Sequence, residues 1–159
     1  MFEESTVLLA RSGSMYAADQ PSGLRQEATW NEADLTEPEP SRLRILIVDD
    51  HKLIADSLAE ILGNEGFDAI AACDGWAALE LASRFHPDWV VSDVLMPRMN
   101  GVELAIAIRQ NHPATTVLLF SGQAGISEIL REGRRKGYEF ELIAKPIHPL
   151  RLVERLKQG

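Results

Sequence analysis

Hydrophobic and polar positions follow two alternating patterns from residue 44 onward. Short apolar runs, typical of buried strands, alternate with longer stretches in which apolar residues recur every three or four positions, as on one face of a helix. The apolar runs predict strands at 44–48, 67–73, 89–93, 116–120 and 141–144. The periodic stretches predict helices at 51–65, 74–85, 102–110, 126–136 and 149–157.

This alternation indicates an α/β fold in which five parallel strands form one sheet with helices on both faces. Right-handed crossovers leave few topologies for such a chain. The strands are apolar throughout, so we expect both faces of the sheet to be covered. Asp74 is a plausible cap for the second helix, and Gly66 and Gly137 are plausible stops for the first and fourth.

Residues 1–42 differ in composition from the rest of the chain. They are rich in Glu, Ser, Ala and Pro, and eight acidic residues against three arginines give them a net charge of −5, out of −8 for the whole chain. We predict a disordered or extended acidic N-terminal tail over 1–42, a stiff linker at Glu37–Ser41, and a folded domain over 43–159. A transient helical turn over 27–35 and a true start nearer Met15 are alternatives for this segment.

Bulk properties narrow the class of protein. A length of 159 residues suits one compact domain with a tail, and an acidic net charge argues against wholesale nucleic-acid binding. The single cysteine, Cys73, excludes an internal disulfide and is compatible with a reducing compartment. Glu3 and Glu4 stand where a secretory signal needs basic residues, and no apolar window reaches the ~20 residues that span a bilayer. We therefore expect a cytoplasmic protein that does not enter the membrane.

Polar residues cluster where four of the five predicted strands end. They are Asp49, Asp50, Asp93, Ser121 and Lys145. Each has a structural explanation when taken alone: Asp50 or Ser121 could cap the helix that follows, and Lys145 could be an ordinary surface lysine. The carboxyl ends of parallel strands, however, meet at one edge of the sheet, where α/β proteins bind ligands. The coincidence therefore favours one functional site.

The chemistry of these residues suits phosphoryl transfer. Three carboxylates in one site repel one another, and a divalent cation such as Mg²⁺, which prefers oxygen ligands, relieves the repulsion. The cation also keeps Asp93 ionised, as a nucleophile must be. Lys145 and Ser121 offer a positive charge and a hydroxyl donor to the oxygens of the transferred group. We predict that the product is an aspartyl phosphate on Asp93.

In this order, these residues resemble the receiver domain of two-component response regulators. The matching segments are Val48-Asp49-Asp50, the stretch 93–101 with its Pro97 and Gly101, Ser121-Gly122 and Lys145-Pro146, with Asp74-Gly75 and Ala78-Leu79 in the second helix. The resemblance covers about 115 of the 159 residues and implies a flavodoxin-like (βα)5 fold with strand order 2-1-3-4-5.

The resemblance also implies roles for the site residues. Asp93 is the phosphoacceptor. Asp50, Asp93 and the backbone carbonyl of Leu95 bind Mg²⁺ directly, while Asp49 acts through a metal-bound water. Ser121 is the switch hydroxyl.

Lys145 is the cation that meets the phosphate, and Lys145–Pro146 is a cis peptide. The chain departs from the family at three places. Leu142 stands at the usual aromatic switch position, although Tyr138 and Phe140 are nearby. Gly122 stands where alanine is common, and the span from Ser121 to Lys145 is longer than in many receivers. Leu95 and Gln123 occupy positions that tune hydrolysis of the phosphate, so we predict slow self-dephosphorylation.

The implied function is phosphorelay signalling. A stand-alone receiver would accept its phosphoryl group from a sensor histidine kinase or a phosphotransfer protein and would switch the binding of a downstream protein, with no direct nucleic-acid contact. A receiver-like adaptor that works without phosphorylation is the alternative. A haloacid-dehalogenase-like phosphatase would have aspartate where Leu95 stands, and a flavodoxin would have a phosphate-binding loop after the first strand.

The basic cluster Arg131, Arg134, Arg135 and Lys136 is either a solvated helix end or a docking patch.

Overall fold

The computed structural model describes residues 41–122 and 125–159. The chain divides into two units between residues 41 and 42, and the description below concerns the second unit. The predicted tail up to residue 40, its possible turn at 27–35, and Gln123 lie outside the described residues.

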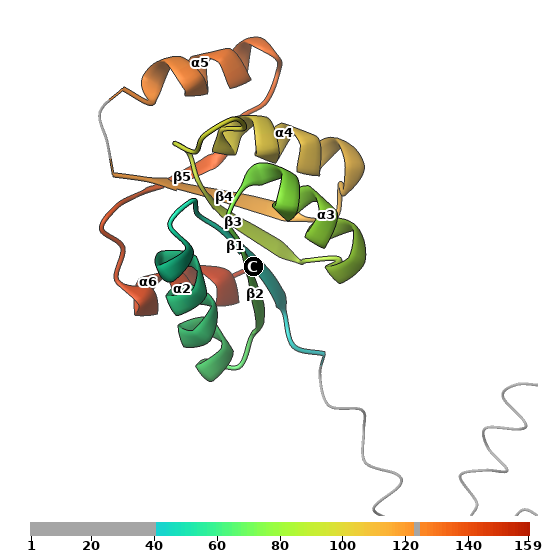
Figure 1. Ribbon diagram of the computed structural model, residues 1–159, viewed down its shortest axis with the longest axis vertical. Coiled ribbons are helices and arrows are strands. Elements are labelled where there is room, and N and C mark those ends of the chain that lie inside the picture. The colour runs from blue at the N-terminus through green and yellow to red at the C-terminus, as the bar shows by residue number, and fades with distance from the viewer. Residues whose placement is uncertain (1–40, 123–124) are drawn as a thin grey trace, which may run out of the picture. The chain divides into compact units, whose positions relative to one another are not determined.

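The described residues form one parallel sheet of five strands in the order β2-β1-β3-β4-β5 (Figure 1). The strands are β1 (Arg44–Val48), β2 (Asp68–Ala72), β3 (Trp89–Asp93), β4 (Thr116–Ser121) and β5 (Glu141–Ala144). All four pairings between neighbouring strands are parallel. The predicted fold class and strand order are therefore confirmed.

Five helices connect and follow these strands. They are α2 (Lys52–Asn64), α3 (Gly75–Phe85), α4 (Gly101–Asn111), α5 (Ser127–Arg135) and α6 (Pro149–Lys157). Every predicted strand and helix boundary agrees with the structure to within one residue. The predicted Asp74 cap is confirmed, because its carboxylate accepts a 2.8 Å hydrogen bond from the Ala77 N–H.

The sheet separates two hydrophobic clusters. Helices α3, α4 and α5 cover one face, and α2 and α6 cover the other (Figure 1). Alternation along β1 sends Leu46 and Val48 into the first cluster and Ile45 and Ile47 into the second. Both faces of the central strands are therefore packed, as the apolar sequence of these strands predicts.

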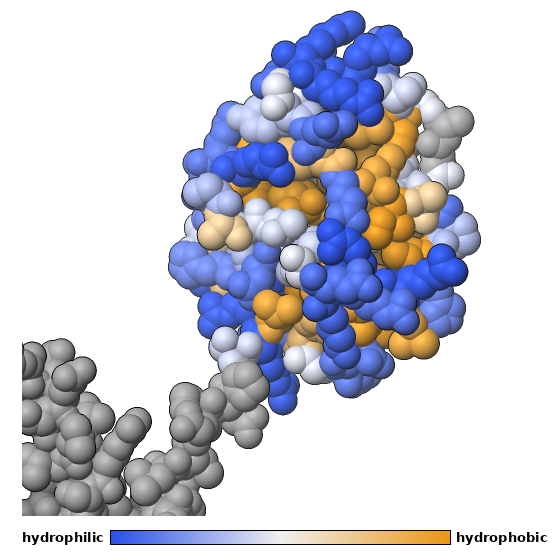
Figure 2. Space-filling model, turned by 180° about the vertical axis from the view of Figure 1, so that it is seen from behind, coloured by the Kyte–Doolittle hydropathy of each residue, from blue (hydrophilic) through white to orange (hydrophobic). Residues whose placement is uncertain are grey.

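The two edge strands are less covered than predicted. Residues of β1, β3 and β4 are almost all buried, whereas β2 is mostly half-buried and three of the four residues of β5 are exposed. An edge strand has a neighbour on only one side, so its apolar side chains reach solvent more easily. Figure 2 shows hydrophobic side chains at the surface of the domain between hydrophilic ones. Within the described residues, no helix combines the length and the apolar character needed to cross a bilayer.

Candidate functional site

The carboxyl ends of β1, β3 and β5 bring three of the predicted site residues into contact. The ammonium Nζ of Lys145 lies 3.2 Å from Asp93 Oδ2 and 3.4 Å from Asp49 Oδ2. Asp49 is fully buried and Asp93 is nearly so. Lys145 therefore bridges two buried carboxylates at the edge of the sheet, which gives the pair its counter-charge.

The backbone of Asp93 is held by the start of α4. The N–H of Gly101 donates a 2.8 Å hydrogen bond to the carbonyl of Val94. A Cβ atom at Gly101 would lie 2.1 Å from the carbonyl oxygen of Asp93, so only glycine permits this approach. Asn100 caps the helix by accepting from the Glu103 N–H at 2.8 Å, while the Glu103 carboxylate accepts from the Asn100 N–H at 2.9 Å. This reciprocal capping box fixes the loop between Asp93 and α4.

Ser121 ends β4 beside the lysine. It is buried, and its carbonyl accepts a 2.9 Å hydrogen bond from the Lys145 N–H. It does not cap α5, whose N-cap position is Ile126. Asp50 likewise does not cap α2, whose N-cap position is His51. The purely structural explanations for Ser121 and Asp50 as helix caps are therefore wrong.

The side chain of Lys145 is enclosed by the two residues that flank Ser121. Its Nζ lies 4.6 Å from the centre of the Phe120 ring, and its Cβ lies 3.1 Å from where a Cβ of Gly122 would be. The Lys145–Pro146 peptide is cis. Sequence analysis missed Phe120, because an aromatic residue inside an apolar strand predicts only burial.

Asp49, Asp50 and His51 form an acidic cluster that could hold a cation. One ligand atom from each lies within 4.8 Å of the other two. Asp50 Oδ1 is buried without a hydrogen-bond partner in the described part of the chain, although His51 Nδ1 lies 3.3 Å away. A buried carboxylate oxygen of this kind is stabilised by a cation, and the carboxylate oxygens of Asp49 and Asp50 are ligands that suit Mg²⁺. Sequence analysis did not include His51, whose Nδ1 also lies 3.2 Å from Asp49 Oδ1.

Electrostatics at Asp93 support the need for added positive charge. Burial raises the pKa of the Asp93 carboxyl above its ordinary value, the Lys145 ammonium lowers this pKa, and the negative charge of Asp49 raises it. The first effect is the largest, so the net direction is upward. Lys145 alone therefore does not fully offset the cost of burying an ionised Asp93.

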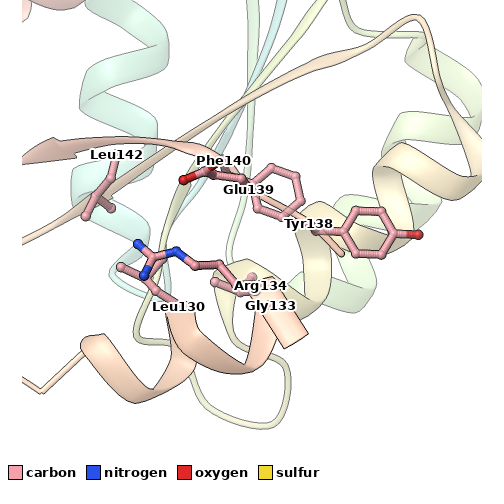
Figure 3. A pocket seen from close by; sticks show the side chains of 8 residues that line it. Leu130, Gly133, Arg134, Tyr138, Glu139, Phe140 and Leu142 are labelled. Carbon is pink, nitrogen blue, oxygen red and sulfur yellow. The ribbon is translucent and has the colours of Figure 1, made fainter. Parts of the chain in front are cut away.

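The remaining predicted residues lie around this centre. Leu95 follows β3 with its side chain partly exposed, two residues after Asp93. Leu142 lies on β5 and lines a cavity of about 90 Å³ (Figure 3). In Figure 3 this cavity lies between α5, which contributes Leu130 and Arg134, and the segment 138–142. Neither Asp93 nor Lys145 lines it, so Leu142 faces a separate space.

Next to this cavity, two aromatic residues pack against α4. The rings of Tyr138 and Phe140 are parallel with centroids 6.2 Å apart. The Arg109 guanidinium lies 4.9 Å from the Phe140 ring centre, and Gln110 Nε2 donates a 3.2 Å hydrogen bond to the Tyr138 hydroxyl. These two aromatic side chains are therefore anchored to the C-terminal part of α4.

A five-stranded parallel sheet in the order 2-1-3-4-5, with acidic residues and a lysine at its carboxyl edge, defines the class of α/β signalling domains that receive a phosphoryl group. The chain belongs to the response regulator receiver domain family, whose sequence model matches residues 45–157. A receiver domain is a phosphoacceptor signalling domain and not a classical enzyme.

Individual relatives agree with this assignment. The chain is 34% identical over 116 residues to the DNA-binding response regulator MtrA of Mycobacterium tuberculosis strain H37Rv. The matched residues make up 73% of this chain and 50% of MtrA. The chain therefore spans half the length of that relative. Among solved structures, Vibrio cholerae CheY4 is 29% identical with a TM-score of 0.65, covering 74% of this chain and 98% of that one. The receiver domain of Brucella abortus NtrX is 32% identical with a TM-score of 0.61, covering 72% and 95%.

Proposed function

We propose that Asp93 accepts the phosphoryl group in this receiver domain and that Lys145 and Ser121 stabilise the group in transit. The observation that carries the proposal is the Lys145 ammonium, 3.2 Å from Asp93 Oδ2 at the carboxyl edge of the sheet. The ammonium is within reach of any oxygen that becomes attached to Asp93, and Ser121 ends the neighbouring strand. A cation and a hydroxyl beside the acceptor oxygen suit the charge that phosphoryl transfer develops.

The transfer step joins one carboxylate oxygen of Asp93 to phosphorus. The oxygen contributes a lone pair to the new P–O bond while the N–P bond of a phosphohistidine donor breaks. The electron pair of the broken bond stays on the imidazole nitrogen. When the other ring nitrogen of the phosphohistidine carries a proton, the ring leaves as neutral imidazole and no further proton is needed. The Lys145 ammonium, already 3.2 Å from Asp93 Oδ2, offers its positive charge to the oxygens of the phosphoryl group.

The residues present fit a magnesium ion. Asp50, Asp93 and the Leu95 carbonyl would hold it, and Asp49 would act through a bound water. Support comes from the acidic cluster at 49–51 and from the buried Asp50 Oδ1, which has no hydrogen-bond partner among the described residues. When bound, the ion supplies positive charge to the phosphoryl oxygens and favours the ionised form of Asp93.

Apolar side chains beside the site support docking of a protein phosphodonor. Helices α2 and α6 both begin at the carboxyl edge of the sheet, and their first turns expose Leu53, Ile54 and Leu150. Leu53 is 81% exposed, so its side chain is accessible to a protein partner. The donor is a sensor histidine kinase or a phosphotransfer protein, and the phosphorylated domain switches the binding of a downstream protein in the cytoplasm through Ser121 and Leu142.

The test is labelling with radioactive acetyl phosphate, with Mg²⁺ and with the ion removed by a chelator. Asp93→Asn should abolish labelling, because an amide is not a nucleophile. Asp68→Asn is the matched control, since Asp68 starts β2 at the opposite edge of the sheet and is exposed. Mass spectrometry should place the label on Asp93. Labelling that persists in Asp93→Asn would contradict the assignment, and no labelling of the wild type would favour an adaptor that works without phosphorylation.

A further inference from the structure

The inference concerns how Lys145 is held at Asp93, and it rests on the proposed function. A lysine side chain has a flexible stem of four carbons and usually samples many rotamers. Here its ammonium is fixed between two carboxylates, 3.2 Å from Asp93 Oδ2 and 3.4 Å from Asp49 Oδ2. Carboxylates alone would leave the ammonium free to approach either acid from several directions. A further contact is needed to fix its direction.

The ring of Phe120 supplies that contact. Lys145 Nζ lies 4.6 Å from the ring centre, inside the ~6 Å range over which an aromatic face attracts a cation. Phe120 is 4% exposed and the Lys145 side chain is 27% exposed, so the contact is partly shielded from water, which strengthens the attraction. The ring cannot move freely, because it belongs to the cluster of buried residues that packs against α2 and α6.

The stem of Lys145 is guided from the other side. A Cβ at Gly122 would lie 3.1 Å from Lys145 Cβ and 3.6 Å from Lys145 Cδ. The absence of that Cβ leaves the space through which the lysine stem passes. The residue before Ser121 therefore lies against the lysine ammonium and the residue after it leaves room for the lysine stem, while the Ser121 carbonyl accepts a 2.9 Å hydrogen bond from the Lys145 N–H.

We infer that Phe120 is a positioning residue for phosphoryl transfer: its ring face holds the Lys145 ammonium over the Asp93 carboxylate, and Gly122 leaves room for the lysine stem. Phe120 does not touch the reacting atoms. It acts by keeping the ammonium at the place where phosphoryl oxygens arrive, so that less reorganisation is needed in the transition state.

The first measurement detects the contact in the resting protein. Protons held over a ring face resonate upfield, so the Lys145 ε-methylene signal should be displaced from those of Lys52, Lys136 and Lys157, which complete the four lysines of the chain. Loss of one signal in Lys145→Arg gives the assignment. Phe120→Leu should return the Lys145 signal to the ordinary lysine position. A Lys145 signal already at that position in the wild type would overturn the inference.

The second measurement is the rate of labelling by acetyl phosphate in excess Mg²⁺. Phe120→Leu should slow labelling about three- to tenfold, the range expected for loss of a partly desolvated cation–π contact. The matched control is Phe67→Leu, because Phe67 is 5% exposed, belongs to the same buried cluster as Phe120 and directly precedes β2, away from the carboxyl ends of the strands. Its labelling rate should equal that of the wild type. An equal loss in both variants would show a general effect of core truncation and overturn the inference.

A third variant separates the electrostatic effect of the Phe120 ring from its packing, in case Phe120→Leu folds poorly. Replacing Phe120 by 3,4,5-trifluorophenylalanine keeps the shape of the ring and removes the negative potential of its face. Labelling should slow about as much as in Phe120→Leu, and a wild-type rate would overturn the inference. The NMR signal of the resting protein can be measured without phosphorylation, so it tests the Phe120 inference separately from the proposed function. An upfield Lys145 signal in a protein that acetyl phosphate never labels would support the Phe120–Lys145 contact and reject only the proposed function.

Discussion

A single methyl group at Gly101 tests how firmly α4 holds the backbone of Asp93. The added Cβ would lie 2.1 Å from the carbonyl oxygen of Asp93 and 2.9 Å from both the Asp93 carbonyl carbon and Val94 Cα. Close carbon–oxygen contacts in proteins are about 3.3 Å, so one side must move by about 1.2 Å. All three contacted atoms are backbone, so no side chain can rotate away. Either α4 or the end of β3 must shift.

The cost can be worked out from the same geometry. Overpacking of this kind costs about 1–3 kcal/mol, and more when only backbone can yield. For a domain of this size that corresponds to a fall in Tm of roughly 4–12 °C. The displacement also moves Asp93 relative to Lys145, and a misplacement of about 1 Å in a reacting group costs on the order of 10²-fold in rate. We therefore expect Gly101→Ala to lower both the thermal midpoint and the labelling rate.

Gly63→Ala is the matched control, because it makes the same chemical change with the opposite expectation. Gly63 lies in α2, is exposed, and has nothing within 4 Å of an added Cβ. Alanine is favoured over glycine in a helix by about 0.5–1 kcal/mol, so this variant should melt a few degrees higher and label at the wild-type rate. The assays are thermal unfolding by circular dichroism and labelling with acetyl phosphate. A Gly101→Ala protein that melts and labels like the wild type would refute the close approach described here.

Three further predictions follow from other parts of the site. Because burial raises the pKa of Asp93 in the folded protein, ionised Asp93 opposes folding. Asp93→Asn should therefore raise the Tm at pH 7 in a chelating buffer. This gain in Tm should vanish as the pH falls below the ordinary aspartate pKa of about 4. A gain that does not change with pH would contradict this origin. Asn100→Ala removes the cap that holds the Glu103 N–H and should destabilise the domain by about 1 kcal/mol in urea unfolding, whereas an unchanged midpoint would show that the cap contributes nothing. Leu95→Asn should speed loss of label from the phosphoprotein by about tenfold, which needs only ~1.4 kcal/mol of the barrier, and equal rates in the two proteins would exclude a role for Leu95.

The fold was predictable because local signals agreed with the periodicity. Apolar runs and helical repeats alternate without interruption, and the residues that end helices are present in the sequence. Gly66 and Gly137 have φ angles of 95° and 86°, a conformation that glycine adopts without strain, and each follows the end of a helix. The exposure of β5 was not predictable in the same way, because hydrophobicity does not reveal which strand lies at the edge of a sheet.

The site was predictable as far as it depends on topology. Parallel strands place their carboxyl ends together, so Asp49, Asp93 and Lys145 could be expected to meet, and in the structure they do. Contacts that depend on side-chain direction were missed: Phe120 beneath the lysine and His51 beside the acids carry no positional signal in one sequence. The Asn-x-x-Glu spacing from Asn100 to Glu103 was an available signal of a capping box.

The exposed position of β5 has a consequence for how the domain behaves at high concentration. An open strand edge can pair with the same edge of another molecule and begin an extended sheet. Here the strand has only four residues. It begins with Glu141, whose carboxylate is paired with Arg155. Lys145 follows the strand, and the next residue, Pro146, has no N–H to donate. A short, charged strand ended by proline gives a second copy too few hydrogen bonds to hold. The domain can thus leave β5 uncovered for a partner without inviting growth into fibres.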